Sequence, residues 1–143
     1  MATQSPRDIQ KRTFDFAIRI VKMVDRLPRS LAAVEIGRQV LRSGTSVGAN
    51  VQEADAAESK KDFVHKLGIA RKEVQETRYW LGIIRVAILC NDAEVEALFR
   101  ESDELTRILY TIARNTRLKQ YAATSAPILS FVICSFVILR GAL

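Results

Sequence analysis

The sequence contains few of the residues from which catalytic and metal sites are built. Its 143 residues include one histidine, His65, and two cysteines, Cys90 and Cys134. One histidine excludes a multi-histidine metal site, and two cysteines in unrelated contexts form neither a metal-binding pair nor a disulfide framework. The sequence also has no glycine-rich phosphate loop and no nucleophile elbow. We therefore expect a protein that is not an enzyme and binds no metal or cofactor, with His65 as a solvated side chain.

Acidic residues are scarce compared with basic ones. Asp and Glu total 16 against 22 Lys and Arg, so the net charge is +6, which favours polyanionic partners. Hydrophobic residues make up 48% of the chain, enough for the core of one domain. Residues 1–6 lack the apolar stretch of a secretory signal, and the isolated cysteines fit a reducing compartment. We expect a cytoplasmic location.

Prolines and capping residues indicate where helices begin and end. A serine or aspartate side chain accepts a hydrogen bond from the first turn of a helix, and proline disfavours helical geometry in the residue before it. The second of the four predicted helices spans about residues 31–57. The predicted starts and stops are Ser5-Pro6, Leu27-Pro28, Ser30, Ser59 and Asn91-Asp92.

Apolar residues recur at helical spacing in all four segments, most clearly in the third and fourth, where spacings of four and three alternate. Three glycines interrupt the second segment at a cost of about 1 kcal/mol each relative to alanine, which a close approach of helices or a kink would explain. The predicted inner faces are Phe14, Ala17, Val21 and Val24; Ile36, Val40, Val47, Val51 and Ala54; Phe63, Leu67, Ala70, Val74, Thr77, Leu81, Ile84 and Ile88; and Val95, Leu98, Ser102, Leu105, Leu109, Ile112 and Thr116.

Short connections make consecutive helices antiparallel neighbours. We therefore predict an all-α fold, an antiparallel up-down-up-down four-helix bundle over residues 1–122. Residues 123–143 form an apolar tail that we expect to lie outside the bundle. Its apolar run, residues 128–139, is about 18 Å long as a helix, short of a hydrocarbon core of about 30 Å, so a membrane anchor is not favoured. The tail is the one segment whose pattern also fits a strand.

One polar set shares a face of the second helix. Arg42, Ser46, Asn50 and Glu53 follow spacings of four, four and three, and Glu73, Glu76 and Thr77 of the third helix are able to face them. We interpret this set as a hydrogen-bond network that fixes helix register, in preference to a ligand site.

Basic residues form the second set of interest. Arg100, Arg107 and Arg114 repeat every seven residues, and no acidic residue follows Glu104. Guanidinium groups suit phosphate because each offers a forked set of donors. The alternative is a solvated face. The candidate nucleic-acid-binding residues are Arg12, Arg19, Lys22, Arg26, Arg100, Arg107, Arg114, Arg117 and Lys119.

Apolar residues also occur away from the predicted inner faces. A helix in a four-helix monomer buries one stripe, so a second stripe indicates a subunit interface. The candidate interface residues are Phe16, Ile20 and Met23 in the first helix, and Tyr79, Trp80, Ile83 and Val86 in the third.

Three segments carry a family resemblance: GRQVLRSGTSVGANVQEA at residues 37–54, SKKDF at 59–63 and EVQETRYWL at 73–81. With the spaced Arg-Ser, Ser, Asn and Glu of the first segment, the chain resembles the 23S rRNA-intervening sequence proteins over about residues 12–118. The resemblance implies a bundle that assembles into a homopentamer, without established enzymatic activity. The chain is also similar to the accessory variability determinant proteins of diversity-generating retroelements, which bind nucleic acid and a reverse transcriptase. The tail has no counterpart in the family pattern.

These observations predict an oligomeric bundle that binds RNA or DNA non-specifically through its basic surface. The alternative is a protein–protein adaptor or scaffold in which the charge serves only solubility.

Overall fold

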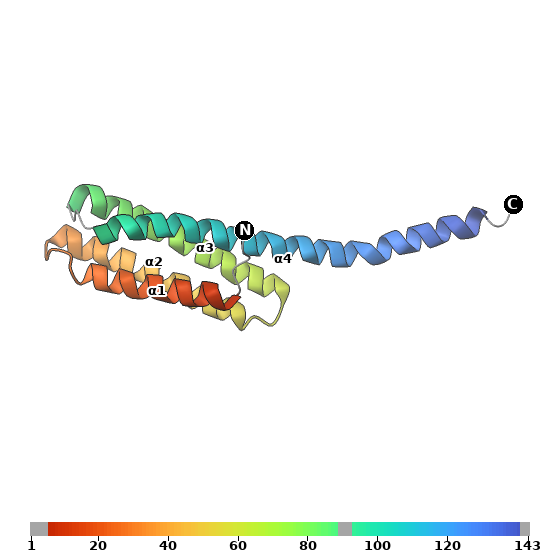
Figure 1. The fold of residues 1–143 in the computed structure, drawn as a ribbon, viewed down its shortest axis with the longest axis horizontal. Coiled ribbons are helices and arrows are strands. Elements are labelled where there is room, and N and C mark those ends of the chain that lie inside the picture. The colour runs from red at the N-terminus through yellow and green to blue at the C-terminus, as the bar shows by residue number, and fades with distance from the viewer. Residues whose placement is uncertain (1–5, 89–92, 141–143) are drawn as a thin grey trace.

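The protein is a helical bundle in the computed structural model, which describes the backbone of residues 6–88 and 93–140 and the side chains of residues 8–87 and 93–122. These residues form α1 (Pro6–Val24), α2 (Leu31–Asp55), α3 (Lys60–Ile83), the π-helical turn η1 (Ile84–Ile88) and α4 (Ala93–Arg140). Figure 1 shows each helix running opposite to the one before it. No strand occurs within the described ranges. The predicted all-α four-helix bundle is confirmed.

The helix starts follow from local chemistry, as predicted. Ser30 caps α2, where its hydroxyl oxygen accepts a hydrogen bond from the backbone N–H of Ala33 at 3.2 Å. Ser59 caps α3 in the same way, accepting from the N–H of Asp62 at 3.1 Å. Each cap satisfies one backbone donor that the first turn leaves unpaired. The predicted caps at Ser5 and at residues 91–92 lie outside the described residues.

The predicted inner faces of α2, α3 and α4 form the core. Most of these residues are buried, while residues at the ends of the pattern, such as Phe63 and Ile112, are partly buried and pack against the core. The side chain of Ile88 lies outside the described residues. The buried members are Val40, Val47, Val51 and Ala54; Leu67, Ala70, Val74, Thr77, Leu81 and Ile84; and Val95, Leu98, Ser102, Leu105 and Leu109.

In α1 the most buried face is not the predicted one, although Val24 of the predicted face is partly buried against the core. Phe16, Ile20 and Met23 are at most 1% exposed, whereas Phe14 is 63% and Val21 37% exposed. The prediction that Phe14 and Val21 face the core is therefore wrong, and so is the assignment of Phe16, Ile20 and Met23 to a subunit interface. Both faces of α1 are apolar, so the hydrophobic pattern of this helix alone does not select its rotation.

The glycines of α2 explain part of this choice. A Cβ atom added at Gly44 would lie 2.9 Å from Cγ2 of Ile20, and one added at Gly48 would lie 3.3 Å from the carbonyl oxygen of Thr13. Both glycines therefore allow α1 to approach α2 closely. A close approach of helices is one of the two reasons that the sequence suggested for glycines inside this helix. Of the two apolar faces of α1, the one with Ile20 fits this groove.

The C-terminal segment continues α4 without a break. Its backbone is helical as far as Arg140, and in Figure 1 this part of α4 extends beyond the other three helices. The expectation that the tail also fits a strand is therefore wrong. None of the described helical segments is both long and apolar enough to cross a bilayer. The division of the chain at residue 122 stays a prediction.

Candidate nucleic-acid interface

Two of the predicted nucleic-acid-binding arginines instead join α1 to α4. Arg12 forms ion pairs with Glu101, with an Nε–Oε1 distance of 2.6 Å, and with Glu104. Arg19 pairs with Glu94 at 2.7 Å. These hydrogen bonds raise the pKa of both guanidinium groups above the ordinary arginine value. Because these charges are already neutralised, Arg12 and Arg19 are poor candidates for phosphate contacts.

A second set of cross-helix pairs joins α3 and η1 to α4. Arg85 pairs with Glu96 at 2.9 Å, and Arg78 pairs with Asp103 at 2.8 Å. The guanidinium carbons of both arginines also lie over the ring of Phe99, 4.4 Å and 4.3 Å from its centroid. Charge and ring stacking together hold these helices side by side.

The two arginines and their two carboxylate partners are each seven residues apart, and the same spacing continues toward the start of α3. There the partner of the arginine is an aromatic ring and not a carboxylate. Arg71 stands one step before Arg78, and Tyr110 one step after Asp103. The guanidinium of Arg71 lies over the Tyr110 ring at 5.7 Å from its centroid. We call this series of pairs the α3–α4 ladder. Its arginines, which repeat at 71, 78 and 85, were missed in the sequence although the repeat itself is visible there.

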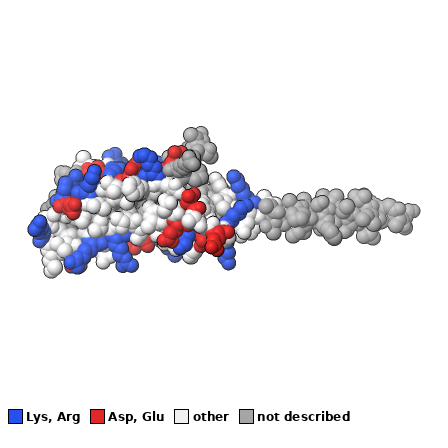
Figure 2. All heavy atoms as spheres, turned by 90° about the horizontal axis from the view of Figure 1, so that it is seen from below, with Lys and Arg blue, Asp and Glu red and all other residues white. Residues whose placement is uncertain are grey.

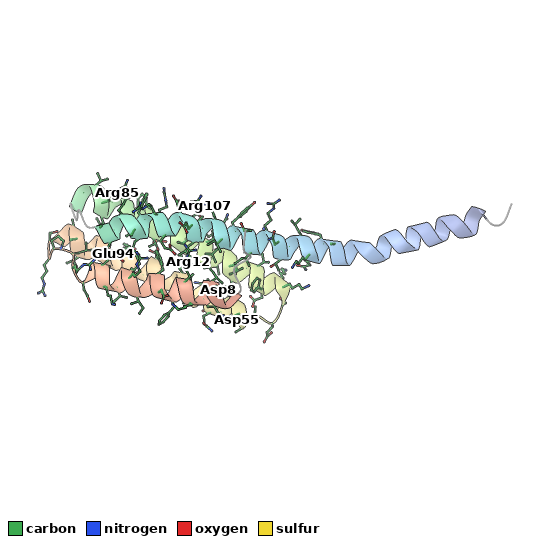
Figure 3. The ribbon with its side chains drawn as sticks, in the orientation of Figure 1. Asp8, Arg12, Asp55, Arg85, Glu94 and Arg107 are labelled. Carbon is green, nitrogen blue, oxygen red and sulfur yellow. The ribbon has the colours of Figure 1, made fainter. Side chains whose placement is uncertain are left out.

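The cations of α4 differ from those of the ladder. Arg100, Arg107, Arg114, Arg117 and Lys119 are all exposed, and no carboxylate of the described residues forms an ion pair with them. Figure 3 shows Arg107 on the side of α4 that faces away from Arg12 and α1. Lys22 and Arg26, near the α1–α2 turn, are exposed as well. On the face seen in Figure 2, cationic side chains also stand where α4 leaves the bundle.

Two adjoining hollows lie between the first half of α3 and α4. Their volumes are about 240 Å³ and about 470 Å³, and both are lined by Arg117 and Tyr121. Among the residues that the structure describes, no carboxylate lines either one. The other polar and aromatic lining residues are Arg71, Tyr110 and Arg114 in the first hollow, and Lys61, His65 and Gln120 in the second. We refer to the two together as the α3–α4 hollow.

The predicted polar network is only partly assembled. Asn50 donates to the backbone carbonyl of Ser46 at 2.9 Å, within α2, and Glu53 pairs with Lys66 of α3 at 2.6 Å. The buried cross-helix contact lies elsewhere: the Thr77 hydroxyl is within hydrogen-bonding distance, 3.0 Å, of the Ser43 hydroxyl. This pair is a buried polar contact between α2 and α3 and includes Thr77 of the predicted set, whose role in fixing helix register stays a prediction.

The acidic members of that set do not face a common partner. Glu76 is exposed and accepts a hydrogen bond from the indole N–H of Trp80 at 3.2 Å. Burial raises the pKa of Glu73, the neighbouring charge of Glu76 raises it further, and Arg42 lowers it. Arg42 therefore lies near enough to Glu73 to influence its charge.

The sequence model of the 23S rRNA-intervening sequence protein family matches residues 7–111, most of the chain. The chain belongs to this family. A crystal structure of a protein of unknown function from the S23 ribosomal protein family of Bacteroides thetaiotaomicron is 35% identical to it, with a TM-score of 0.70. That match covers 76% of this chain and 97% of the other. No curated protein matches the chain.

The match to the 23S rRNA-intervening sequence family ends inside the α3–α4 hollow. Arg71 and Tyr110 lie within the matched residues, whereas Arg114, Arg117 and Tyr121 follow them. Of the exposed α4 cations, Arg100 and Arg107 therefore lie within the residues that the family model matches, and Arg114, Arg117 and Lys119 lie beyond them.

The remaining candidate interface residues of this 23S rRNA-intervening sequence protein divide into two groups. Tyr79 is 62% and Val86 71% exposed, whereas Trp80 and Ile83 are partly buried. Another exposed apolar row runs along α1, formed by Phe14, Ile18 and Val21. If this protein self-associates, the α1 row and the Tyr79–Val86 surface are the candidate contacts in place of Phe16, Ile20 and Met23.

Proposed function

We propose that this member of the 23S rRNA-intervening sequence protein family is a non-enzymatic, oligomeric bundle that binds RNA or DNA through cations on α4. The binding residues are Arg100, Arg107, Arg114, Arg117 and Lys119. They contact phosphate, so binding depends little on base sequence. A pentamer is the assembly that the family resemblance implies, with the exposed apolar residues of α1 as contacts.

The observation that carries this proposal is the division of the arginines into two groups. Arg12, Arg19, Arg78 and Arg85 pair with carboxylates, while the cations of α4 have no such partner among the described side chains. Holding the bundle together explains the first group. It does not explain a row of exposed cations on a helix without a carboxylate after Glu104.

Salt dependence and charge reversal test the proposal together. Affinity for a fluorescein-labelled oligonucleotide of mixed sequence, measured by anisotropy, is expected to fall linearly with the logarithm of salt concentration. Each neutralised phosphate contributes about 0.9 to that slope on duplex DNA, so the loss of two contacts at about 0.1 M salt weakens binding about 60-fold. The combined variant Arg107→Glu and Arg114→Glu is expected to show this loss.

A matched control is available on α2. Arg38 is exposed and its only ion-pair partner among the described residues is Glu35, at 3.6 Å on the same helix. Arg38→Glu makes the same charge change as Arg107→Glu but away from α4, and it is expected to weaken binding much less. Affinity that hardly changes with salt, or a double variant that binds as tightly as the wild type, would overturn the proposal.

The second candidate function is a protein–protein adaptor. The exposed row of Phe14, Ile18 and Val21 favours it, because a soluble monomer gains nothing from a contiguous apolar stripe. A pull-down from nuclease-treated lysate that recovers one protein and no nucleic acid would support the adaptor. Light scattering of the purified protein distinguishes an adaptor surface from a self-association surface through its mass.

A further inference from the structure

The α3–α4 ladder changes character along its length. At one end of the ladder, Arg85 of η1 and Arg78 of α3 each meet a carboxylate of α4, in the pairs Arg85–Glu96 and Arg78–Asp103. One step further, Arg71 meets the ring of Tyr110, and the following step on α4 is Arg117, a cation. Among the described side chains, the arginines are therefore paired with carboxylates at one end of the ladder, whereas Arg71 and Arg117 at the other end have no carboxylate partner.

The uncompensated end coincides with the α3–α4 hollow, whose lining includes exposed aromatic rings. Tyr110 is 51% and Tyr121 74% exposed, and both contribute to the lining. Arg114 and Arg117 lie on the same side of α4, four and seven residues after Tyr110. A hollow that combines cationic groups with partly exposed rings, and whose described lining includes no carboxylate, offers contacts both to phosphates and to the faces of bases.

We infer that the α3–α4 hollow binds single-stranded nucleic acid, with bases stacked on Tyr110 and Tyr121 and backbone phosphates held by Arg71, Arg114 and Arg117. This inference rests on the proposed function and narrows it to a strand type and a site. A duplex keeps its bases stacked inside the helix, so it reaches the same cations only through its phosphates. Base–aromatic stacking tolerates any sequence because every base has a π-face.

Tyrosine replacement separates stacking from charge. The combined variant Tyr110→Ala and Tyr121→Ala keeps every cation, so duplex affinity is expected to stay within about twofold of the wild type. Affinity for a labelled single strand is expected to fall at least about fivefold, since each stacked base contributes about fivefold to about 150-fold. Tyr110→Phe with Tyr121→Phe keeps the rings and is expected to bind like the wild type. Leu31→Ala removes a large exposed side chain outside the hollow and serves as the control.

The wild-type protein offers a second test that does not depend on a variant's folding. An abasic single strand carries the same phosphates without bases, so it is expected to bind at least about fivefold more weakly than the matched normal strand. Equal affinity for the two strands, or a Phe variant as impaired as the Ala variant, would overturn the inference.

The outcomes also separate the inference from the proposed function. In one outcome, binding depends on salt and is lost on charge reversal of α4, but neither the tyrosine replacements nor the abasic strand changes the affinity. That outcome retains the proposed function and refutes the stacking site. Absence of binding to both strand types at low salt refutes the proposed function and the inference with it.

Discussion

Replacing Gly44 with alanine would place a methyl group against Ile20 in the closest part of the α1–α2 contact. The added Cβ atom would lie 2.9 Å from Cγ2, 3.0 Å from Cγ1 and 3.3 Å from Cβ of Ile20. Ile20 is fully buried and branched at Cβ, so no single rotation moves all three atoms away. The two helices must therefore separate locally for the methyl group to fit.

The expected size of this effect is the difference between two terms. Overpacking a well-packed contact costs about 1–3 kcal/mol, and alanine returns about 1 kcal/mol through its helix propensity. We expect Gly44→Ala to lower the free energy of unfolding by about 1 kcal/mol. Gly68→Ala in α3 is the matched control, because nothing lies within 4 Å of its added Cβ. It is expected to raise the free energy of unfolding by about 1 kcal/mol.

Urea unfolding followed by circular dichroism, at one protein concentration for all variants, measures both changes. The Ile20→Ala background provides the sharper test, since it removes the two closest atoms. There, Gly44→Ala is expected to change sign and become stabilising. If Gly44→Ala stabilises the wild type as much as Gly68→Ala does, or if its effect is unchanged in the Ile20→Ala background, close packing of α1 against α2 is not the reason for this glycine.

Two further predictions concern the charged groups. Arg12→Met removes the ion pairs with Glu101 and Glu104, and the side chains of Arg12 and Glu101 are only 25% and 19% exposed. This variant is expected to lower the free energy of unfolding, measured by urea titration, by about 2 kcal/mol. Lys11→Met breaks the exposed pair with Asp15 and is expected to change the free energy of unfolding by less than about 1 kcal/mol. Equal effects of the two variants would contradict the assignment of Arg12 to the α1–α4 contact. Because burial raises the pKa of Glu73 in the folded state, its contribution to stability is full below the ordinary carboxyl pKa of about 4.3 and is lost as pH rises through the folded-state pKa. Glu73→Gln is therefore expected to remove this loss, so its stability relative to the wild type is higher at neutral pH than at pH 4. Thermal melts of both proteins across that pH range measure the difference. The opposite trend would show that the folded state stabilises Glu73 as the carboxylate.

Local signals in the sequence were sufficient for the helices and for three of their four inner faces. The caps formed by Ser30 and Ser59 depend only on local sequence, because each hydroxyl oxygen accepts a hydrogen bond from the backbone N–H three residues later. In α3 and α4 the alternation of four and three residues runs along most of the helix and marks the face that packs inward. Short connections then leave an antiparallel bundle as the natural arrangement.

The sequence alone did not determine the rotation of α1 or the partners of the arginines. Phe14 and Phe16 stand on two apolar faces of the same helix, and contacts with residues distant in sequence, such as the fit of Ile20 against Gly44, select between them. Arg12 and Arg107 look alike in the sequence, yet one meets Glu101 across the bundle and the other does not meet a carboxylate among the described side chains. Rotation and charge pairing are properties of contacts between helices, so they exist only once the tertiary structure has formed.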